Sequence, residues 1–356
     1  MIFAGATAIS GIQMKSVLFE EMGANRHLLK PYALDLEVYS IDEAFLSLPA
    51  VDYQEHGLSI VAMLNQSVGM PVCVGVAPTK TLSKLANHAA KKIPALNGVC
   101  VLDAAPKWNW LLQRLPVNEI WGVGRHLTQQ LNAQGIHTAL DLAQSDPKSI
   151  RSQYSVVLER TVRELNGVAC ADLEGVQASK NEIVCTRSFS YKITELNELQ
   201  QAISQYAGRA CEKLRAQNGL TDNFWVYLES FDKTVGYYCR HIIVELPRLT
   251  NDTRLIAKLA AGAVAEIYRP KLRYKKCGIG LLDIRSRQHE QSDFLNPEQS
   301  EKSQATMRLL DQINGRFGKQ TVKLASTGLL PRWIMKREYL SPAYTTRWED
   351  LPRVVC

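Results

Sequence analysis

Residues 37–45 restrict the possible folds of this chain more than any other segment. This segment reads as a strand-like hydrophobic run (Val38, Tyr39, Ile41 and Phe45), yet Asp42 and Glu43 stand side by side in its middle. Removing a carboxylate from water is costly unless the charge is paired or coordinates a metal. Two interpretations remain open: a strand end or hairpin tip whose acids face water, or a metal site. Since neighbouring residues of a regular strand point to opposite faces, both acids can serve one metal site only where the backbone bends.

Composition excludes several classes of protein. The 356 residues, 46% hydrophobic and 22% charged, are typical of a soluble globular protein with two or three domains. The eight cysteines form no CxxC pair and no zinc-ligand spacing, which predicts reduced thiols and a cytoplasmic location. No apolar segment is long enough to cross a bilayer, so no membrane partner is expected.

The excess positive charge lies in one segment. Residues 180–287 contain eighteen Lys and Arg against eleven Asp and Glu, a difference of +7, which equals the net charge of the whole chain. Such a concentration indicates a polyanionic partner, with a basic but functionless surface as the alternative.

Periodicity and turn residues predict an α+β multidomain protein. Helices are expected at 13–22, 59–68, 79–92, in several short pieces within 109–168, and at 196–215, 253–268 and 304–315. Strands are expected at 37–49, 71–77, 183–189, 224–231, 235–245 and 277–284. The second half then contains two βαβ-like passes and a hairpin, which predicts a sheet with helices on one face.

The helix expected at 79–92 has two different faces. At 100° per residue its polar side chains fall on one side and its leucines and alanines on the other. The apolar side is expected to pack, leaving the cationic side either for anions or simply for water. The polar residues are Lys80, Lys84, Asn87 and Lys91.

Residues 121–125, Trp-Gly-Val-Gly-Arg, precede another helical stretch that ends near Gly135. Glycines let a turn approach a phosphate closely, and the following helix presents free N–H groups. This pattern resembles a helix-hairpin-helix, in which Gly122, Gly124 and Arg125 would approach a phosphate. A dinucleotide-binding turn is the competing interpretation, but residues 115–120 make a poor buried strand.

Taken together, these motifs resemble those of the Y-family DNA polymerases that perform translesion synthesis. The resemblance rests on Ser40-Ile-Asp-Glu43, on the helix of residues 83–92 and on the order of the segments, and it is greatest for the UmuC-like members of the family. It implies five regions. They are a partial palm at 1–108, an all-helical thumb at 109–172, a tether at 173–181, an α+β little finger at 182–287 and an irregular tail at 288–356.

The resemblance also implies roles for individual residues. Asp42 and Glu43 would be the catalytic acids that hold Mg²⁺, and Lys91 would contact the incoming deoxynucleoside triphosphate. Primed or damaged DNA would be bound by a further set of side chains. That set comprises Lys80, Lys84, Gly122, Gly124, Arg125, Arg187, Ser188, Arg240, Lys271, Arg273 and Lys275.

Partner proteins follow from the same resemblance. Gln291, Phe294 and Leu295 resemble a motif that binds the sliding clamp. The stretch from Trp333 to Val355 resembles a tail associated with a UmuD′-like dimer, and RecA is a further expected partner.

The resemblance is incomplete at the N-terminal end. Y-family polymerases carry a first catalytic aspartate and a fingers region before the Ser-Ile-Asp-Glu motif, and residues 1–39 resemble neither. We therefore expect a truncated palm sheet with an unpaired edge, and no substitution by Asp35, which would lie roughly 23 Å from Asp42 on one strand. The implied function is error-prone DNA synthesis in DNA repair and SOS mutagenesis, with catalysis incomplete in this chain. The alternatives are a non-catalytic remnant that binds DNA and accessory proteins, and an unrelated nucleotide-binding α/β protein.

Overall fold

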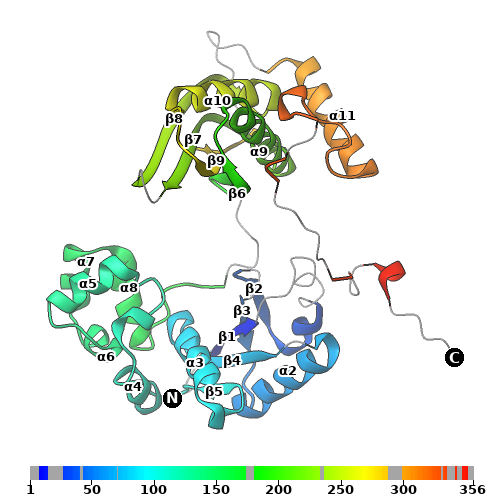
Figure 1. Ribbon diagram of the computed structural model, residues 1–356. Coiled ribbons are helices and arrows are strands. Elements are labelled where there is room, and N and C mark those ends of the chain that lie inside the picture. The colour runs from blue at the N-terminus through cyan, green and yellow to red at the C-terminus, as the bar shows by residue number, and fades with distance from the viewer. Residues whose placement is uncertain are drawn as a thin grey trace. The chain divides into compact units, whose positions relative to one another are not determined.

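The computed structural model divides into two compact units, residues 1–177 and 178–356 (Figure 1). The division falls inside the stretch predicted as a tether. The structure describes residues 8–14, 27–40, 43–69, 71–173, 180–232, 236–287, 299–329, 332–334, 341–342 and 347–351. No helix in this described part is long and apolar enough to span a membrane.

The first unit is built on a five-stranded sheet with the order β2-β3-β1-β4-β5. All neighbours are antiparallel except β4 and β5, which are parallel. The strands are β1 (Ala8–Met14), β2 (Asp35–Val38), β3 (Glu43–Leu48), β4 (Val72–Ala77) and β5 (Val99–Val101).

Two helices cover opposite faces of this sheet. Val72, Val74 and Val76 of β4 pack in the core that contains α2 (Tyr53–Val68). The alternate residue Gly75 faces α3 (Lys80–Lys92), because a Cβ atom at Gly75 would lie only 2.2 Å from the backbone nitrogen of Asn87. Only glycine therefore allows α3 to lie this close to the sheet.

A group of helices continues from the α3 side. Leu82 and Leu85 of α3 share a core with Leu131, Leu142 and other residues of these helices. The helices are α4 (Ala105–Leu112), α5 (Arg125–Ala133), α6 (Ala139–Ala143), α7 (Pro147–Gln153) and α8 (Val156–Leu165). This segment is all-helical, as predicted for residues 109–168.

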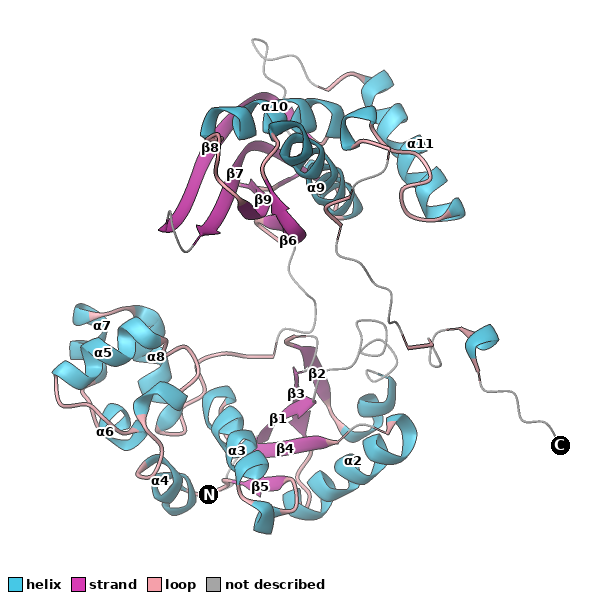
Figure 2. Cartoon of the chain, viewed as in Figure 1, coloured by secondary structure: helices cyan, strands magenta, loops and turns pink. Residues whose placement is uncertain are grey.

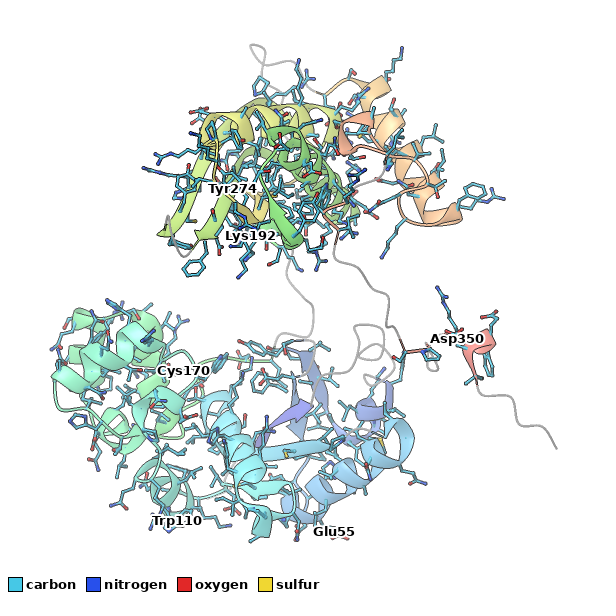
Figure 3. All side chains as sticks on the ribbon, in the orientation of Figure 1. Glu55, Trp110, Cys170, Lys192, Tyr274 and Asp350 are labelled. Atoms are coloured by element: carbon cyan, nitrogen blue, oxygen red, sulfur yellow. The ribbon has the colours of Figure 1, made fainter. Side chains whose placement is uncertain are left out.

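The second unit is a sheet covered on one face by helices, as the element order predicted (Figure 2). The strand order is β10-β7-β9-β6, and the long strand β8 also pairs with β7. The elements are β6 (Ile183–Ile193), α9 (Leu196–Ala216), β7 (Gly219–Asp232), β8 (Gly236–Thr250), α10 (Thr253–Ile267), β9 (Tyr274–Leu282) and β10 (Arg285–Ser286). Side chains from β6, β7 and β9 pack with α9 and α10, and Tyr274, labelled in Figure 3, is fully buried among them.

A later helix joins this second unit. Arg215 of α9 donates two hydrogen bonds to Asp311 of α11 (Glu301–Phe317), at 2.6 and 2.7 Å. Further along, Trp333 is only 3% exposed and its ring contacts Phe189 and Tyr206. The backbone N–H of Ser190 also donates to the carbonyl of Trp333. This part of the predicted irregular tail therefore completes the core of the second unit.

Two predictions about the first unit are wrong, and a third is contradicted at its first two residues. Residues 37–49 form a hairpin of β2 and β3, because the chain reverses between Val38 and Glu43. The expected helix at 13–22 begins inside β1, and residues 15–22 lie outside the described part. The sheet has no unpaired position where a strand was expected to be missing, since β1 pairs with both β3 and β4.

Candidate active site

Glu43 lies at the tip of the β2–β3 hairpin, where the backbone bends. The backbone N–H groups of Tyr39 and Ser40 both donate to the carbonyl of Glu43, at 3.0 Å each. Asp42, predicted with it as a catalytic acid, lies just outside the described residues. Asp35 lies on β2 and not on the strand that carries Glu43. It still lies away from the hairpin tip, because it pairs with Ser47, four residues along β3 from Glu43.

The polar side of α3 faces this hairpin rather than solvent. The Lys84 ammonium lies 3.0 Å from the Glu43 carboxylate, and Asn87 donates to the carbonyl of Cys73 at 2.6 Å. Both sides of α3 are therefore packed, one against the sheet and the other against the helices that follow. The prediction that the cationic side remains open for anions is wrong for this part of the helix.

Lys80 is buried more deeply than Lys84. It is 4% exposed, and its ammonium donates to Glu37 at 2.6 Å and to the carbonyl of Asp172 at 2.7 Å. A buried ammonium with a carboxylate and a carbonyl as partners has a structural role. We therefore correct the predicted DNA contact of Lys80, because a phosphate cannot reach this buried and paired ammonium.

Three aromatic rings surround the ammonium of Lys84. Its nitrogen lies 4.2 Å from the ring centre of Tyr39, 4.7 Å from that of Trp121 and 5.9 Å from that of Phe45. The Trp121 indole donates to the Tyr39 hydroxyl at 3.2 Å. The sequence did not reveal this cluster, because its members come from three separate segments. The position of Trp121 directly before the glycine turn was the one sequence feature that indicated a role for its ring.

Lys91 lies seven residues beyond Lys84 on α3, which places it on the same side of the helix about 10 Å further along. Its side chain is exposed in the last turn, unlike those of Lys80 and Lys84. This position leaves Lys91 available to a phosphate group.

The central strand provides no acid to the hairpin tip. The register of β1 places Gln13 opposite Glu43, and the β1 sequence AISGIQM contains neither Asp nor Glu. Among the described residues, no three His, Cys, Asp or Glu side chains gather to hold a metal ion. The predicted ligands Asp42 and Glu43 would supply hard oxygen donors of the kind that Mg²⁺ accepts together with substrate phosphates and water.

The glycine turn precedes α5 as predicted. Gly122 has a φ of 87°, which glycine adopts without strain, and Gly124 precedes the first residue of α5 with no side chain capping the helix. The adjoining pocket includes Arg125 and the buried hydroxyl of Tyr154, which has no hydrogen-bond partner among the described residues. A short 3₁₀ turn at Val117–Glu119 stands where a dinucleotide site would need a strand.

The residues predicted to contact DNA in the second unit do not share one face. Arg187 alternates with the buried residues Cys185 and Phe189, so it belongs to the helix-covered side, whereas Ser188 belongs to the other side. Arg240 likewise alternates with Tyr238 and Ile242, which pack against the core. The exposed residues Lys271 and Arg273 lie just before β9, and the exposed Lys275 is its second residue. Gln291, Phe294 and Leu295 are outside the described residues.

Comparison with known proteins agrees with this arrangement. Family profiles described as the impB/mucB/samB family and its C-terminal domain match residues 19–88 and 180–294. Protein UmuC of Salmonella typhimurium is 41% identical over 331 residues, which cover 90% of this chain and 78% of that protein. The chain belongs to the UmuC-like impB/mucB/samB family.

Other UmuC-like relatives and a solved structure support the assignment. Protein ImpB of Salmonella typhimurium is 40% identical, covering 89% of this chain and 77% of the relative. A Y-family DNA polymerase chimera of Dbh and Dpo4 superposes with a TM-score of 0.54 at 22% identity, covering 75% of this chain and 76% of the chimera. The Y-family polymerase fold predicted from sequence is thereby confirmed. Residues 304–354, which include most of α11, match a domain of unknown function, DUF4113.

Proposed function

We propose that this chain acts in translesion DNA synthesis by binding primed or damaged DNA as a UmuC-like polymerase, with nucleotidyl transfer severely weakened. DNA binding is supported by the free helix end at Gly124 and the exposed cations at the start of β9. Weakened transfer is supported by a single observation, the absence of an acid on β1 opposite Glu43. Metal-assisted phosphoryl transfer depends on carboxylates that position the ions against the triphosphate.

Each part of the site has a distinct role in this proposal. Asp42 and Glu43 would hold Mg²⁺, which neutralises charge on the triphosphate when bound. Lys91 would bind a triphosphate oxygen, and the amides at Gly124 and Arg125 would hold a DNA phosphate without reading its sequence. Lys84 would keep the Glu43 carboxylate oriented through their 3.0 Å ion pair.

Primer extension tests the catalytic part. The purified chain and an Asp42→Asn variant would be given a primed template, Mg²⁺ and all four deoxynucleoside triphosphates. We expect no extension from either protein. Extension that disappears in Asp42→Asn would mean that a residue outside β1, such as Glu20 or Glu21, supplies the missing carboxylate.

A salt titration tests the binding part. Lys271→Ala combined with Arg273→Ala should lower the affinity for a primer–template and reduce the slope of log affinity against log salt by about 2, because about one counterion is released per phosphate contact. Lys92→Ala, an exposed lysine at the end of α3, is the matched control. Unchanged affinity and slope in the double variant would contradict the assignment of this surface.

The protein partners and location are part of the same proposal. Residues 291–295 would bind a sliding clamp, and the segment after Trp333 would bind a UmuD′-like dimer or RecA, in the cytoplasm. Trp348 supports a partner-binding tail, since it is 86% exposed.

A further inference from the structure

The sheet of the second unit has an apolar face that no helix of the described residues covers. The helices α9 and α10 pack on the opposite face (Figure 2). On the open face lie Val184, Phe231, Tyr237 and Ile243, whose exposures range from 45% to 65%. Large exposed apolar side chains gathered on one face of a sheet are typical of a binding surface.

Two aromatic rings lie at the centre of this face, directly over glycines. A Cβ atom at Gly280 would approach the Trp225 ring to 2.3 Å, and one at Gly278 would approach the Tyr227 ring to 2.7 Å. The backbone register confirms the placement, since Trp225 pairs with Gly280 and Tyr227 with Gly278. The glycines thus make room for the rings to lie against the sheet, a purpose that a side chain at either position would defeat.

The rings are held in place at their polar atoms and at their edges. The Trp225 indole donates to Glu182 at 3.0 Å, and the centres of the two rings are 5.6 Å apart. Because one side of the indole rests on Gly280, its other side is directed away from the sheet. A fixed ring loses little conformational freedom when a flat ligand stacks on it.

Charge on the face favours an anion. The ammonium of Lys276 lies 5.8 Å from the centre of the Tyr227 ring, and the exposed Lys275 is its neighbour. A hydrogen bond with Tyr227 raises the pKa of Lys276, so this cation remains charged at neutral pH. Glu182 and Glu229 also lie here, but Glu182 is bonded to Trp225 and Glu229 pairs across the strands with Lys276. Residues 180–287 as a whole carry a charge of +7.

We propose that Trp225 and Tyr227 form a stacking platform for unpaired nucleobases of single-stranded DNA. Flat aromatic surface next to lysines matches bases joined by phosphates, and stacking is tolerant of sequence. The proposal rests on the proposed DNA binding and deepens it, because it assigns unpaired DNA to the sheet face and leaves phosphate contacts to Gly124 and to residues 271–275.

The experiment distinguishes binding through bases from binding through phosphates. Binding of a thymidine oligonucleotide of about eight nucleotides would be compared with binding of an abasic oligonucleotide of equal length and charge. We expect the thymidine oligonucleotide to bind about 5- to 150-fold more tightly, and Trp225→Ala to remove most of this difference. Quenching of tryptophan fluorescence by the thymidine oligonucleotide should decrease in the same variant.

Three further variants exclude loss of folding as an explanation. Gly280→Ala keeps the indole but moves it off the sheet, and should also reduce the preference for bases. Trp225→Phe keeps a flat ring and should retain much of it. Trp110→Ala, which removes an exposed tryptophan of the first unit, should change nothing.

Two results would overturn the platform. One is equal binding of the thymidine and abasic oligonucleotides by the unaltered chain. The other is an unchanged preference in Trp225→Ala, which would leave this face to a protein partner. Both are distinguishable from failure of the proposed function, which would appear as no salt-dependent binding of a primer–template at all.

Discussion

Lys84 shows how one side chain can hold several segments together. It pairs with Glu43, and it contacts rings from both the β2–β3 hairpin and the turn before α5. The ion pair is partly shielded from water, so its loss leaves the carboxylate poorly compensated. The tip of the hairpin therefore depends on a residue 41 positions away in the sequence.

We expect Lys84→Ala to lower the free energy of unfolding of the first unit by about 1–3 kcal/mol, since the ion pair and the cation–π contacts are both lost. Urea unfolding followed by tryptophan fluorescence measures this change. Adding Glu43→Gln to Lys84→Ala should recover part of the loss, because the unpaired charge is then gone. Equal stability of Lys84→Ala and the unaltered chain would mean that the contacts contribute nothing.

The ionisation of Asp141 makes the stability of the fold depend on pH. The backbone N–H of Thr138 is the main cause that lowers the pKa of Asp141 below its ordinary 3.8, and burial opposes this only in part. A carboxyl group with a lowered pKa stabilises the fold fully above its unfolded value and loses this effect as the pH falls through its folded value.

Replacing this residue tests that direction. Asp141→Asn should lower the Tm at about pH 7, because the capping box at the start of α6 loses its charged acceptor. The difference from the unaltered chain should shrink below about pH 4 and vanish once Asp141 itself is protonated. Thermal unfolding at several pH values follows this change, and a difference that grew on acidification would contradict the argument.

At the scale of elements, the contact between β4 and α3 positions the candidate active site. Gly75 is required there because its missing side chain would overlap the backbone of α3 at Ser83 and Asn87. We expect Gly75→Ala to destabilise the first unit by about 3 kcal/mol, since backbone atoms on both sides must move. Calorimetry of the first unit's transition provides the measurement.

Gly262→Ala is a matched control for this prediction. Gly262 lies within α10 and has open space around it, so alanine should stabilise that helix by up to about 1 kcal/mol. A similar loss of stability in both variants would show that the crowding at Gly75 is not the cause.

Local patterns predicted most elements but not the hairpin at the candidate site. The strand at 71–77 and the helix at 79–92 were predicted closely, because the first is rich in β-branched residues and the second has an uninterrupted polar periodicity. The β2–β3 turn lacks Gly, Pro and Asn, so the hydrophobic run at 37–49 was predicted as one strand and the reversal was missed. The partners of Lys80 and Lys84 depend on contacts across roughly forty residues, which periodicity cannot report.

At the scale of the whole molecule, the second unit includes residues far beyond its sheet. Trp333 fills a space beside Phe189 and Tyr206, and its loss would leave a cavity. We expect Trp333→Ala to lower the free energy of unfolding of the second unit by about 3–5 kcal/mol. Chemical denaturation of the full chain, compared with Trp348→Ala, measures the effect.

An unchanged second unit in Trp333→Ala would mean that the sheet and its two helices are sufficient alone. The buried pair of Arg215 and Asp311 provides an independent check, because Asp311→Ala removes the charge that Arg215 requires. Loss of stability in both variants would establish residues 299–334 as part of this fold.

The hydrogen bond from Ser190 to Arg332 spans 142 residues of sequence. During synthesis on the ribosome, β6 emerges long before this segment. Until the segment arrives, the edge of β6 lacks this hydrogen bond, and the space beside Phe189 and Tyr206 that the Trp333 indole fills stays empty. Domains of nascent chains generally fold as units, so the second unit cannot reach its final form until nearly the whole chain has emerged. A message cut shortly before codon 333 would thus yield a chain that has every strand of its sheet and still attracts chaperones.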